Sequence, residues 1–284
     1  MKNLKLHIRK ISLIIGSIII ITAVPILLKE VLFKPLLGLL NIDPEIIKNI
    51  SGVISTILLI VTYYFVFKIF EKRKILELSP KYFAKESIVG FAFGFMIISL
   101  IILGLFLLNS YSIISINNPR SLYKPLIVFT LMGIWEEIIF RGIIYRITEN
   151  WLGTVWALII SSLVFGFVHL ANDQANFLSG IGIALELGLL TGITFTLTRR
   201  LWVPLFLHIG WNYALVFYGA IVSGANEFDN FIESNIDGAT FITGGEFGPE
   251  NSIITILLSI IIFSLLYKKA IDTNKAIRNT KNNN

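Results

Sequence analysis

The sequence predicts an all-α protein, a polytopic membrane bundle of about eight transmembrane helices with a polar site buried between spans 4, 5 and 7. Of its 284 residues, 55% are hydrophobic and only 15% are charged, whereas soluble domains carry about 25% charged residues. Long apolar stretches recur along the chain, and Lys and Arg gather in alternate connections between them. This composition excludes disordered and nucleic-acid-binding proteins, and the absence of cysteine excludes disulfides and a cysteine nucleophile.

Eight apolar stretches approach the length of about 20 helical residues that crosses a hydrocarbon core. Their predicted ranges are 11–28, 50–70, 86–108, 123–147, 153–171, 177–198, 201–222 and 252–267. The first is too long and too rich in isoleucine for a signal peptide, so we expect a permanent span. Residues 31–40 contain Pro35 and are predicted to form an interfacial segment instead of a ninth crossing.

Basic residues orient these spans. Lys and Arg concentrate at the N-terminus, after the second and sixth spans, and in the tail, as Lys2, Lys5, Arg9, Lys10, Lys68, Lys72, Arg73, Lys74, Lys81, Lys85, Arg199, Arg200, Lys268, Lys269, Lys275, Arg278 and Lys281. The positive-inside rule makes these connections cytoplasmic, so both termini of this multi-pass cell-membrane protein are expected in the cytoplasm. The connection 223–250 has no Lys or Arg, and it carries the acids Glu227, Asp229, Glu233, Asp237, Glu246 and Glu250.

Ionisable side chains interrupt several spans, where each costs at least about 2.5–3.5 kcal/mol to insert. Residues that persist at such a cost usually face the bundle interior and carry function. The fourth span contains Glu136, Glu137 and Arg141, the fifth Phe165 and His169, the sixth Glu186, and the seventh His208 and Asn212. The fourth, fifth and seventh spans therefore together offer carboxylates, two imidazoles and an amide.

Helix geometry separates some of these residues into roles. Glu137 and Arg141 are four residues apart with the acid first, the favourable order for an ion pair on one face. Glu136 lies about 100° round the helix from Glu137, so it has no partner on its own helix and is free to act on water or substrate. His208 and Asn212 share a face and offer two donors to a developing oxyanion.

Each of these residues also has a structural interpretation. The pair of Glu137 and Arg141 can clamp a helix without taking part in chemistry. His169 can bridge neighbouring helices, and His208 with Asn212 can hold helices together by hydrogen bonds. No single one of these residues indicates a functional site. Their occurrence together on separate spans does.

Depth in the membrane does not by itself bring the residues together. At 1.5 Å per residue from the predicted cytoplasmic ends, Glu136 lies about 16 Å deep, His208 about 10 Å and His169 about 24 Å. Glu186 has no second polar signal beside it in the sequence, which favours a structural role.

The order of the motifs resembles a known family. Glu-Glu-x-x-x-Arg (136–141), Phe-x-x-x-His (165–169) and His-x-x-x-Asn (208–212) follow one another on separate apolar helices. This arrangement is similar to the CPBP family of intramembrane proteases, which includes type II CAAX prenyl proteases and bacteriocin-processing and immunity proteins. The likeness covers roughly residues 120–222.

The resemblance implies a role for each polar residue. The implied catalytic residues are Glu136, His169, His208 and Asn212. Glu136 would be the general base that activates the attacking water, and His169 would assist it. His208 and Asn212 would stabilise the tetrahedral oxyanion. The implied supporting residues are Glu137, Arg141 and Phe165.

A metal is the alternative to a metal-free base. The family is often described as metal-dependent, because a glutamate and two histidines resemble a zinc site with one open position. Here the candidate ligands Glu136, His169 and His208 come from three helices, and no HExxH pair lies on one helix. We therefore expect glutamate-activated water with no cofactor, and zinc at these three residues is the alternative.

The leading prediction is an intramembrane endopeptidase, a hydrolase that acts on a membrane-associated, lipidated or leader-bearing peptide in CAAX-type or bacteriocin processing. Its partners would be that substrate and the lipid bilayer, and no nucleic acid. A non-catalytic scaffold or bacteriocin immunity protein of the same fold stays open, as does, with less support, an ion-coupled transporter. The predicted parts are three spans (1–119), the catalytic core with spans 4–7 (120–222), an acidic extracytoplasmic loop (223–250), and a last span with a basic tail (251–284).

Overall fold

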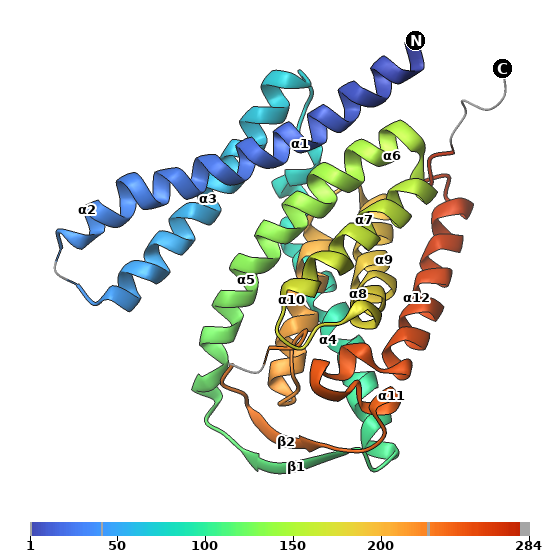
Figure 1. The fold of residues 1–284 in the computed structure, drawn as a ribbon. Coiled ribbons are helices and arrows are strands. Elements are labelled where there is room, and N and C mark those ends of the chain that lie inside the picture. The colour runs from blue at the N-terminus through green and yellow to red at the C-terminus, as the bar shows by residue number, and fades with distance from the viewer. Residues whose placement is uncertain (1, 41, 226–227, 279–284) are drawn as a thin grey trace.

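The computed structural model describes residues 2–40, 42–225 and 228–278, and it is a bundle of long helices (Figure 1). Glu227 and Lys281 lie outside the described residues. The first helix comprises α1 (Lys2–Leu28), the π-helical η1 (Lys29–Phe33) and α2 (Lys34–Gly38). The second, α3 (Pro44–Phe70), returns beside it (Figure 1).

The other long helices build the body of the bundle. They are α4 (Phe83–Leu107), the continuous run of α5 (Tyr123–Glu137), η5 (Ile138–Tyr145) and α6 (Arg146–Leu152), then α7 (Thr154–Val168) with η6 (His169–Ala171), the continuous run of α8 (Phe177–Ile183), η7 (Ala184–Gly188) and α9 (Leu189–Thr198), then α10 (Trp202–Phe217) and α12 (Ile253–Asp272). Short 3-10 turns connect some of them, namely η2 (Leu76–Leu78), η3 (Pro80–Tyr82) and η4 (Pro119–Leu122).

Within the described residues, six helices are long and apolar enough to cross a membrane, which confirms a polytopic helical bundle. They are Leu4–Gly38, Pro44–Phe70, Leu76–Leu107, Thr154–Ala171, Phe177–Thr198 and Ile253–Asp272. The fourth and seventh predicted spans are also helical. The fourth, however, carries the charged motif residues, and α10 has 16 residues against the roughly 20 that a crossing takes. The number of eight crossings therefore stays a prediction.

Residues 31–40 form no separate ninth crossing, as predicted, and their interfacial position stays a prediction. They continue the first helix, whose apolar stretch runs from Leu4 to Gly38. Pro35 does not end this helix because it lies in the first turn of α2, directly after the wide turn of η1. A proline is tolerated where its missing N–H leaves no α-helical hydrogen bond unmade.

The acidic connection 223–250 contains secondary structure. Its strand β2 (Ile232–Ile236) pairs antiparallel with β1 (Tyr111–Ile116), which follows α4. Tyr111 lies opposite Ile236, and Ile116 lies opposite Ile232. The pairing holds the connection against the chain between α4 and α5.

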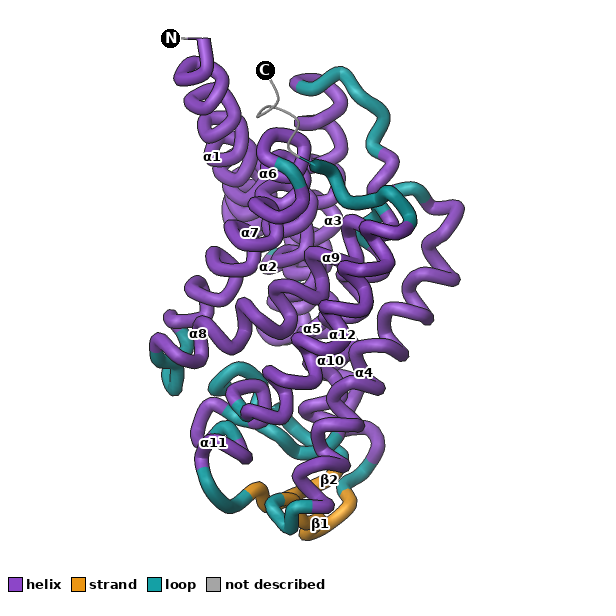
Figure 2. The backbone as a smooth tube through the Cα atoms, turned by 90° about the vertical axis from the view of Figure 1, so that its right-hand side faces the viewer, coloured by secondary structure: helices purple, strands orange, loops and turns teal. Residues whose placement is uncertain are grey.

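The same connection then returns to the bundle through three short turns. They are α11 (Thr240–Thr243), η8 (Gly245–Phe247) and η9 (Pro249–Asn251). Figures 1 and 2 show the two strands and α11 together at one end of the bundle, while both termini lie at the other.

Glycines allow α4 and α10 to pack with their backbones almost in contact. A Cβ atom on Gly94 would lie 2.1 Å from the carbonyl oxygen of Leu207, and one on Gly210 would lie 2.2 Å from that of Phe91. Small residues of this kind let membrane helices approach closely. The close approach fixes the position of α10, which carries His208 and Asn212.

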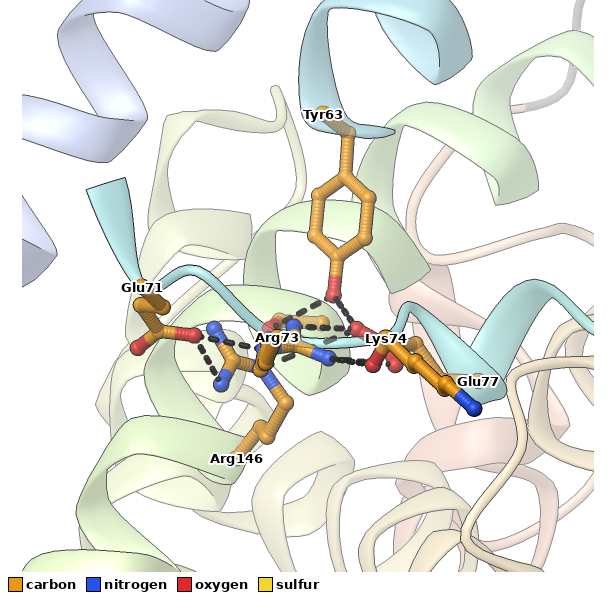
Figure 3. A network of polar contacts seen from close by, with 7 residues as sticks. Tyr63, Glu71, Arg73, Lys74, Glu77 and Arg146 are labelled. Carbon is orange, nitrogen blue, oxygen red and sulfur yellow. Dashed lines mark hydrogen bonds and ion pairs between the residues drawn. The ribbon is translucent and has the colours of Figure 1, made fainter. Parts of the chain in front are cut away.

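At the end of the bundle near the termini, a polar network joins α3 to η5 and α6 (Figure 3). The hydroxyl of Tyr63 donates to Glu77 Oε1 at 2.6 Å. Arg146 donates through Nη1 to Glu71 Oε2 and through Nε to the carbonyl of Gly142, both at 2.8 Å. The residues labelled in Figure 3 are Tyr63, Glu71, Arg73, Lys74, Glu77 and Arg146. These contacts anchor the helix segment that follows Glu136 and Glu137.

The distribution of basic residues predicts the orientation of the bundle. A reporter fused after Asn284 should read cytoplasmic, and one inserted near Gly238, beyond β2, should read external, because Lys and Arg concentrate at the end of the bundle that holds the termini. Paired alkaline phosphatase and green fluorescent protein fusions measure this. The same side for both sites would contradict the orientation.

Candidate active site

Three helices supply the candidate residues, and the structure brings residues from all three into contact. Glu136 and Glu137 end α5, and Arg141 lies in the π-helical η5. Phe165 lies in α7, and His169 begins η6 at the point where α7 tightens. His208 and Asn212 lie one turn apart on α10. Departures from α-helical geometry such as η5 often occur at functional sites.

A fully buried ion pair forms the base of the site. Arg141 Nη1 donates to Glu137 Oε1 at 3.1 Å, and both side chains have no exposed surface. The guanidinium also donates to the carbonyl of Gly188 at 3.1 Å and lies 4.4 Å from the centre of the Phe165 ring. The predicted pair therefore exists, and it reaches two further helices.

Glu137 has a second partner that the sequence did not indicate. His208 Nδ1 lies 3.0 Å from the same Oε1 atom that accepts from Arg141. The hydrogen bond joins α5 to α10 across the bundle. Glu137 therefore does more than pair with Arg141 on its own helix, because it also sets the orientation of the His208 ring.

Glu136, unlike Glu137, has a carboxylate oxygen with no hydrogen-bond partner among the described residues. Its Oε2 atom is buried and accepts no hydrogen bond from the residues that the structure describes. It lies 3.8 Å from His208 Nε2, and the Glu136 side chain is 24% exposed. The His208 ring therefore lies between two acids, with Nδ1 on Glu137 and Nε2 facing Glu136.

His169 approaches the site through Phe165. Its Nδ1 atom lies 2.8 Å from the Phe165 carbonyl oxygen, which orients the ring. The Phe165 ring contacts the rings of both His169 and His208 edge to face, with centroids 4.8 and 5.7 Å apart. In the described part of the chain, no hydrogen bond joins His169 directly to Glu136.

The metal alternative can be tested on the arrangement of donors. Among the described residues, no group of three or more His, Asp or Glu side chains is placed to hold a metal ion. Zinc held by Glu136, His169 and His208 therefore stays the alternative prediction. Of these three candidate ligands, Glu136 and His208 approach each other, with Oε2 and Nε2 3.8 Å apart.

Two buried acids lie beside the predicted residues. Glu186 in η7 is fully buried, and neither of its oxygens has a hydrogen-bond partner among the described residues. Glu250 in η9 is 2% exposed and accepts from Trp211 Nε1 at 2.9 Å. Burial raises the pKa of the Glu250 carboxyl, although the hydrogen bonds from Trp211 and Ser223 oppose this shift.

Sequence reasoning missed Glu250 because it lies in an acidic connection without apolar periodicity. The sequence signal that could have indicated an ordered segment before Glu250 is the cluster of Gly244, Gly245 and Gly248. In the structure all three glycines have positive φ. A Cβ atom on Gly244 would lie 1.7 Å from the Gly248 carbonyl oxygen. Glycines in such conformations indicate a tight, specific turn instead of a solvated loop.

Fold and site together define a polytopic helical membrane protein with a buried centre of paired glutamates and histidines. Residues 118–214 match the family model described as type II CAAX prenyl endopeptidase Rce1-like. This segment includes every predicted site residue from Glu136 to Asn212. Over this segment the chain is similar to the type II CAAX prenyl endopeptidases of the CPBP family.

A curated relative agrees with this assignment. A Bacillus subtilis (strain 168) protein named "Putative membrane peptidase YdiL" is 31% identical over 123 residues. The similar region covers 43% of this chain and 46% of the relative, so the chain spans about half the length of the relative that it matches. No solved structure matches the chain.

The geometry predicts how the buried pair contributes to stability. Arg141→Met should lower the free energy of unfolding by about 3–5 kcal/mol, because it leaves the Glu137 charge buried with one cation fewer. Adding Glu137→Gln should recover much of this loss, since glutamine is neutral and keeps an oxygen for His208 Nδ1. Unfolding of the single and double variants in detergent measures this. If the loss of unfolding free energy in the double variant equals the sum of the losses in the two single variants, the two residues do not act as a pair.

Proposed function

We propose that the protein is an intramembrane endopeptidase in which Glu136 activates a water molecule to cleave a peptide bond. The observation that carries this proposal is the difference between the two adjacent acids. Glu137 accepts from Arg141 and His208. The Oε2 atom of Glu136, by contrast, is buried, has no hydrogen-bond partner among the described residues and faces the same imidazole at 3.8 Å. A general base needs such a free carboxylate within reach of a water.

The proposed reaction starts with proton transfer from water to Glu136 as the water oxygen attacks the carbonyl carbon of the peptide. The carbonyl oxygen becomes an oxyanion, and the C–N bond then breaks. The leaving nitrogen takes the proton from Glu136, which restores the carboxylate. The products are a carboxylic acid and an amine, so the water is the only added reactant.

His208 and Asn212 are the proposed oxyanion donors. Acids face both ring nitrogens of His208, an environment that suits a doubly protonated ring with one N–H held by Glu137 and the other directed at the reacting oxygen. Asn212 is buried one turn further along α10 and supplies an amide. His169, whose ring is oriented by the Phe165 carbonyl, is the proposed assisting residue.

An apolar cavity beside Glu137, the neighbour of the proposed base, favours a substrate with an apolar part. A cavity of about 250 Å³ reaches Glu137 and is otherwise lined almost entirely by apolar side chains. Phe83 and Trp202, the first residues of α4 and α10, lie on its wall. A membrane-associated, lipidated or leader-bearing peptide fits this cavity better than a soluble one.

The Glu136 carboxylate provides the direct test. Glu136→Gln should lower turnover by about 10²–10⁴-fold, the usual contribution of a general base, while the protein still inserts and accumulates. Purified protein in lipid nanodiscs would be assayed with a prenylated CAAX-type peptide and an unprenylated hydrophobic leader peptide. The exposed acid Glu45 provides the matched control as Glu45→Gln. Full turnover by Glu136→Gln would end the proposed mechanism.

Chelation and substitution of His208 distinguish the two forms of water activation. Without a metal, chelators should leave purified activity nearly intact, and His208→Asn should keep more activity than His208→Ala, because asparagine can still donate a hydrogen bond. With zinc, activity should disappear on chelation and return with added Zn²⁺, and asparagine should replace imidazole poorly. Stoichiometric metal whose loss and recovery follow activity would make Glu136, His169 and His208 the ligands.

A further inference from the structure

Glu250 enters the bundle from a segment outside the matched family core. Its Oε1 atom accepts from Trp211 Nε1 at 2.9 Å, and Trp211 is the residue before Asn212 on α10. Its Oε2 atom accepts from the backbone N–H of Ser223 and from the Ser223 hydroxyl, the latter at 3.0 Å. All of these groups donate, so the buried carboxyl serves only as an acceptor.

The hydrogen bonds continue from Ser223 to the other histidine-bearing helix. The side-chain amide of Asn172 donates to the Ser223 carbonyl at 2.7 Å. The backbone N–H of Asn172 donates in turn to the carbonyl of His169 at 3.0 Å. An unbroken path therefore runs from α10 through Glu250 and Ser223 to η6.

The local backbone is arranged to make this path. Ser223 has φ of 48°, a left-handed conformation that is uncommon for residues other than glycine. In this conformation its N–H and hydroxyl both reach Glu250, and its carbonyl reaches Asn172. Such a conformation persists where the surrounding contacts require it.

We propose that Glu250 is a positioning residue of the active site. Its hydrogen bonds to Trp211 and Ser223, which we call the bracket, connect α10 to η6. The bracket sets the spacing between His169 on η6 and the pair His208 and Asn212 on α10. The inference rests on the proposed protease function for its catalytic consequence, and on the hydrogen-bond path alone for its structural one. Glu250 does not touch the reacting atoms. It acts through Trp211 on one side and through Ser223 and Asn172 on the other.

The same connection provides a matched comparison. Glu246 lies four residues earlier and is exposed, whereas Glu250 is 2% exposed. If the negative charge of the connection controlled the spacing of the catalytic helices, substitution of either acid would change that spacing. If the hydrogen bonds of Glu250 control it, only substitution of Glu250 should change it.

Spacing can be measured without any substrate. The chain has no cysteine, so Leu170→Cys and Tyr213→Cys introduce two unique sites for spin labels, one beside His169 and one beside Asn212. Double electron–electron resonance in nanodiscs gives the distance distribution for the parent, Glu250→Ala, Glu250→Gln and Glu246→Gln. We expect the distribution to broaden in Glu250→Ala, partly recover in Glu250→Gln, which keeps one acceptor oxygen, and stay unchanged in Glu246→Gln.

Activity tests the catalytic consequence with the two peptides named above. Glu250→Ala should lower kcat by up to about 10²-fold, the cost of a small misplacement of catalytic groups, with KM nearly unchanged and with partial rescue by Glu250→Gln. Ser223→Ala, which removes only the hydroxyl, should give a smaller loss and keeps the test valid if Glu250→Ala does not fold.

The outcomes separate the two proposals. A distance distribution in Glu250→Ala and Glu250→Gln identical to that of the parent would overturn the bracket, whatever the activity. A kcat equal to that of the parent in both Glu250→Ala and Glu250→Gln would also overturn the positioning role of Glu250. A parent protein that cleaves neither peptide, but whose distance distribution depends on Glu250, would count against the proposed protease function and leave the bracket supported.

Discussion

The Oε1 atom of Glu137 is the point on which the rest of the site depends, because it accepts from both Arg141 and His208. All three side chains are almost completely buried. A buried charge is strongly destabilising when it loses a partner, so each of these residues requires the others. Through them, α5 and η5 are tied to α10, and the Arg141 guanidinium adds η7 through Gly188 and α7 through the Phe165 ring.

This arrangement leaves a division of labour between two adjacent acids. Neighbouring residues on a helix point in different directions. One carboxylate can therefore make the structural hydrogen bonds while the next is left available for chemistry. Glu137 orients the imidazole, and the Glu136 Oε2 atom faces the opposite ring nitrogen with no hydrogen-bond partner in the described part of the chain. Activity in a low-dielectric interior requires groups that are positioned before the substrate arrives, because reorganisation there is costly. The ion pair supplies that order.

Contacts at both ends of the bundle support the central site. Near the termini, Arg146 and Tyr63 hold the carbonyl of Gly142, the residue after Arg141. At the other end, the connection 223–250 is held by strand pairing with β1 and by the burial of Glu250. Between them, Gly94 and Gly210 let α10 approach α4 so closely that no larger residue fits. The position of the histidines is thus fixed from several directions.

The sequence by itself determined the helical membrane class, the three polar motifs and the pairing of Glu137 with Arg141, because these depend on composition and on i,i+4 spacing within one helix. Only the tertiary structure decided that His208 bonds Glu137, that Phe165 lies between the two histidines, and that Glu250 returns from a distant connection. Depths counted along separate helices could not show this. Contacts between helices depend on tilt, on glycine-mediated approach and on the wide turns of η1, η5 and η7, and none of these follows from the local periodicity of one segment.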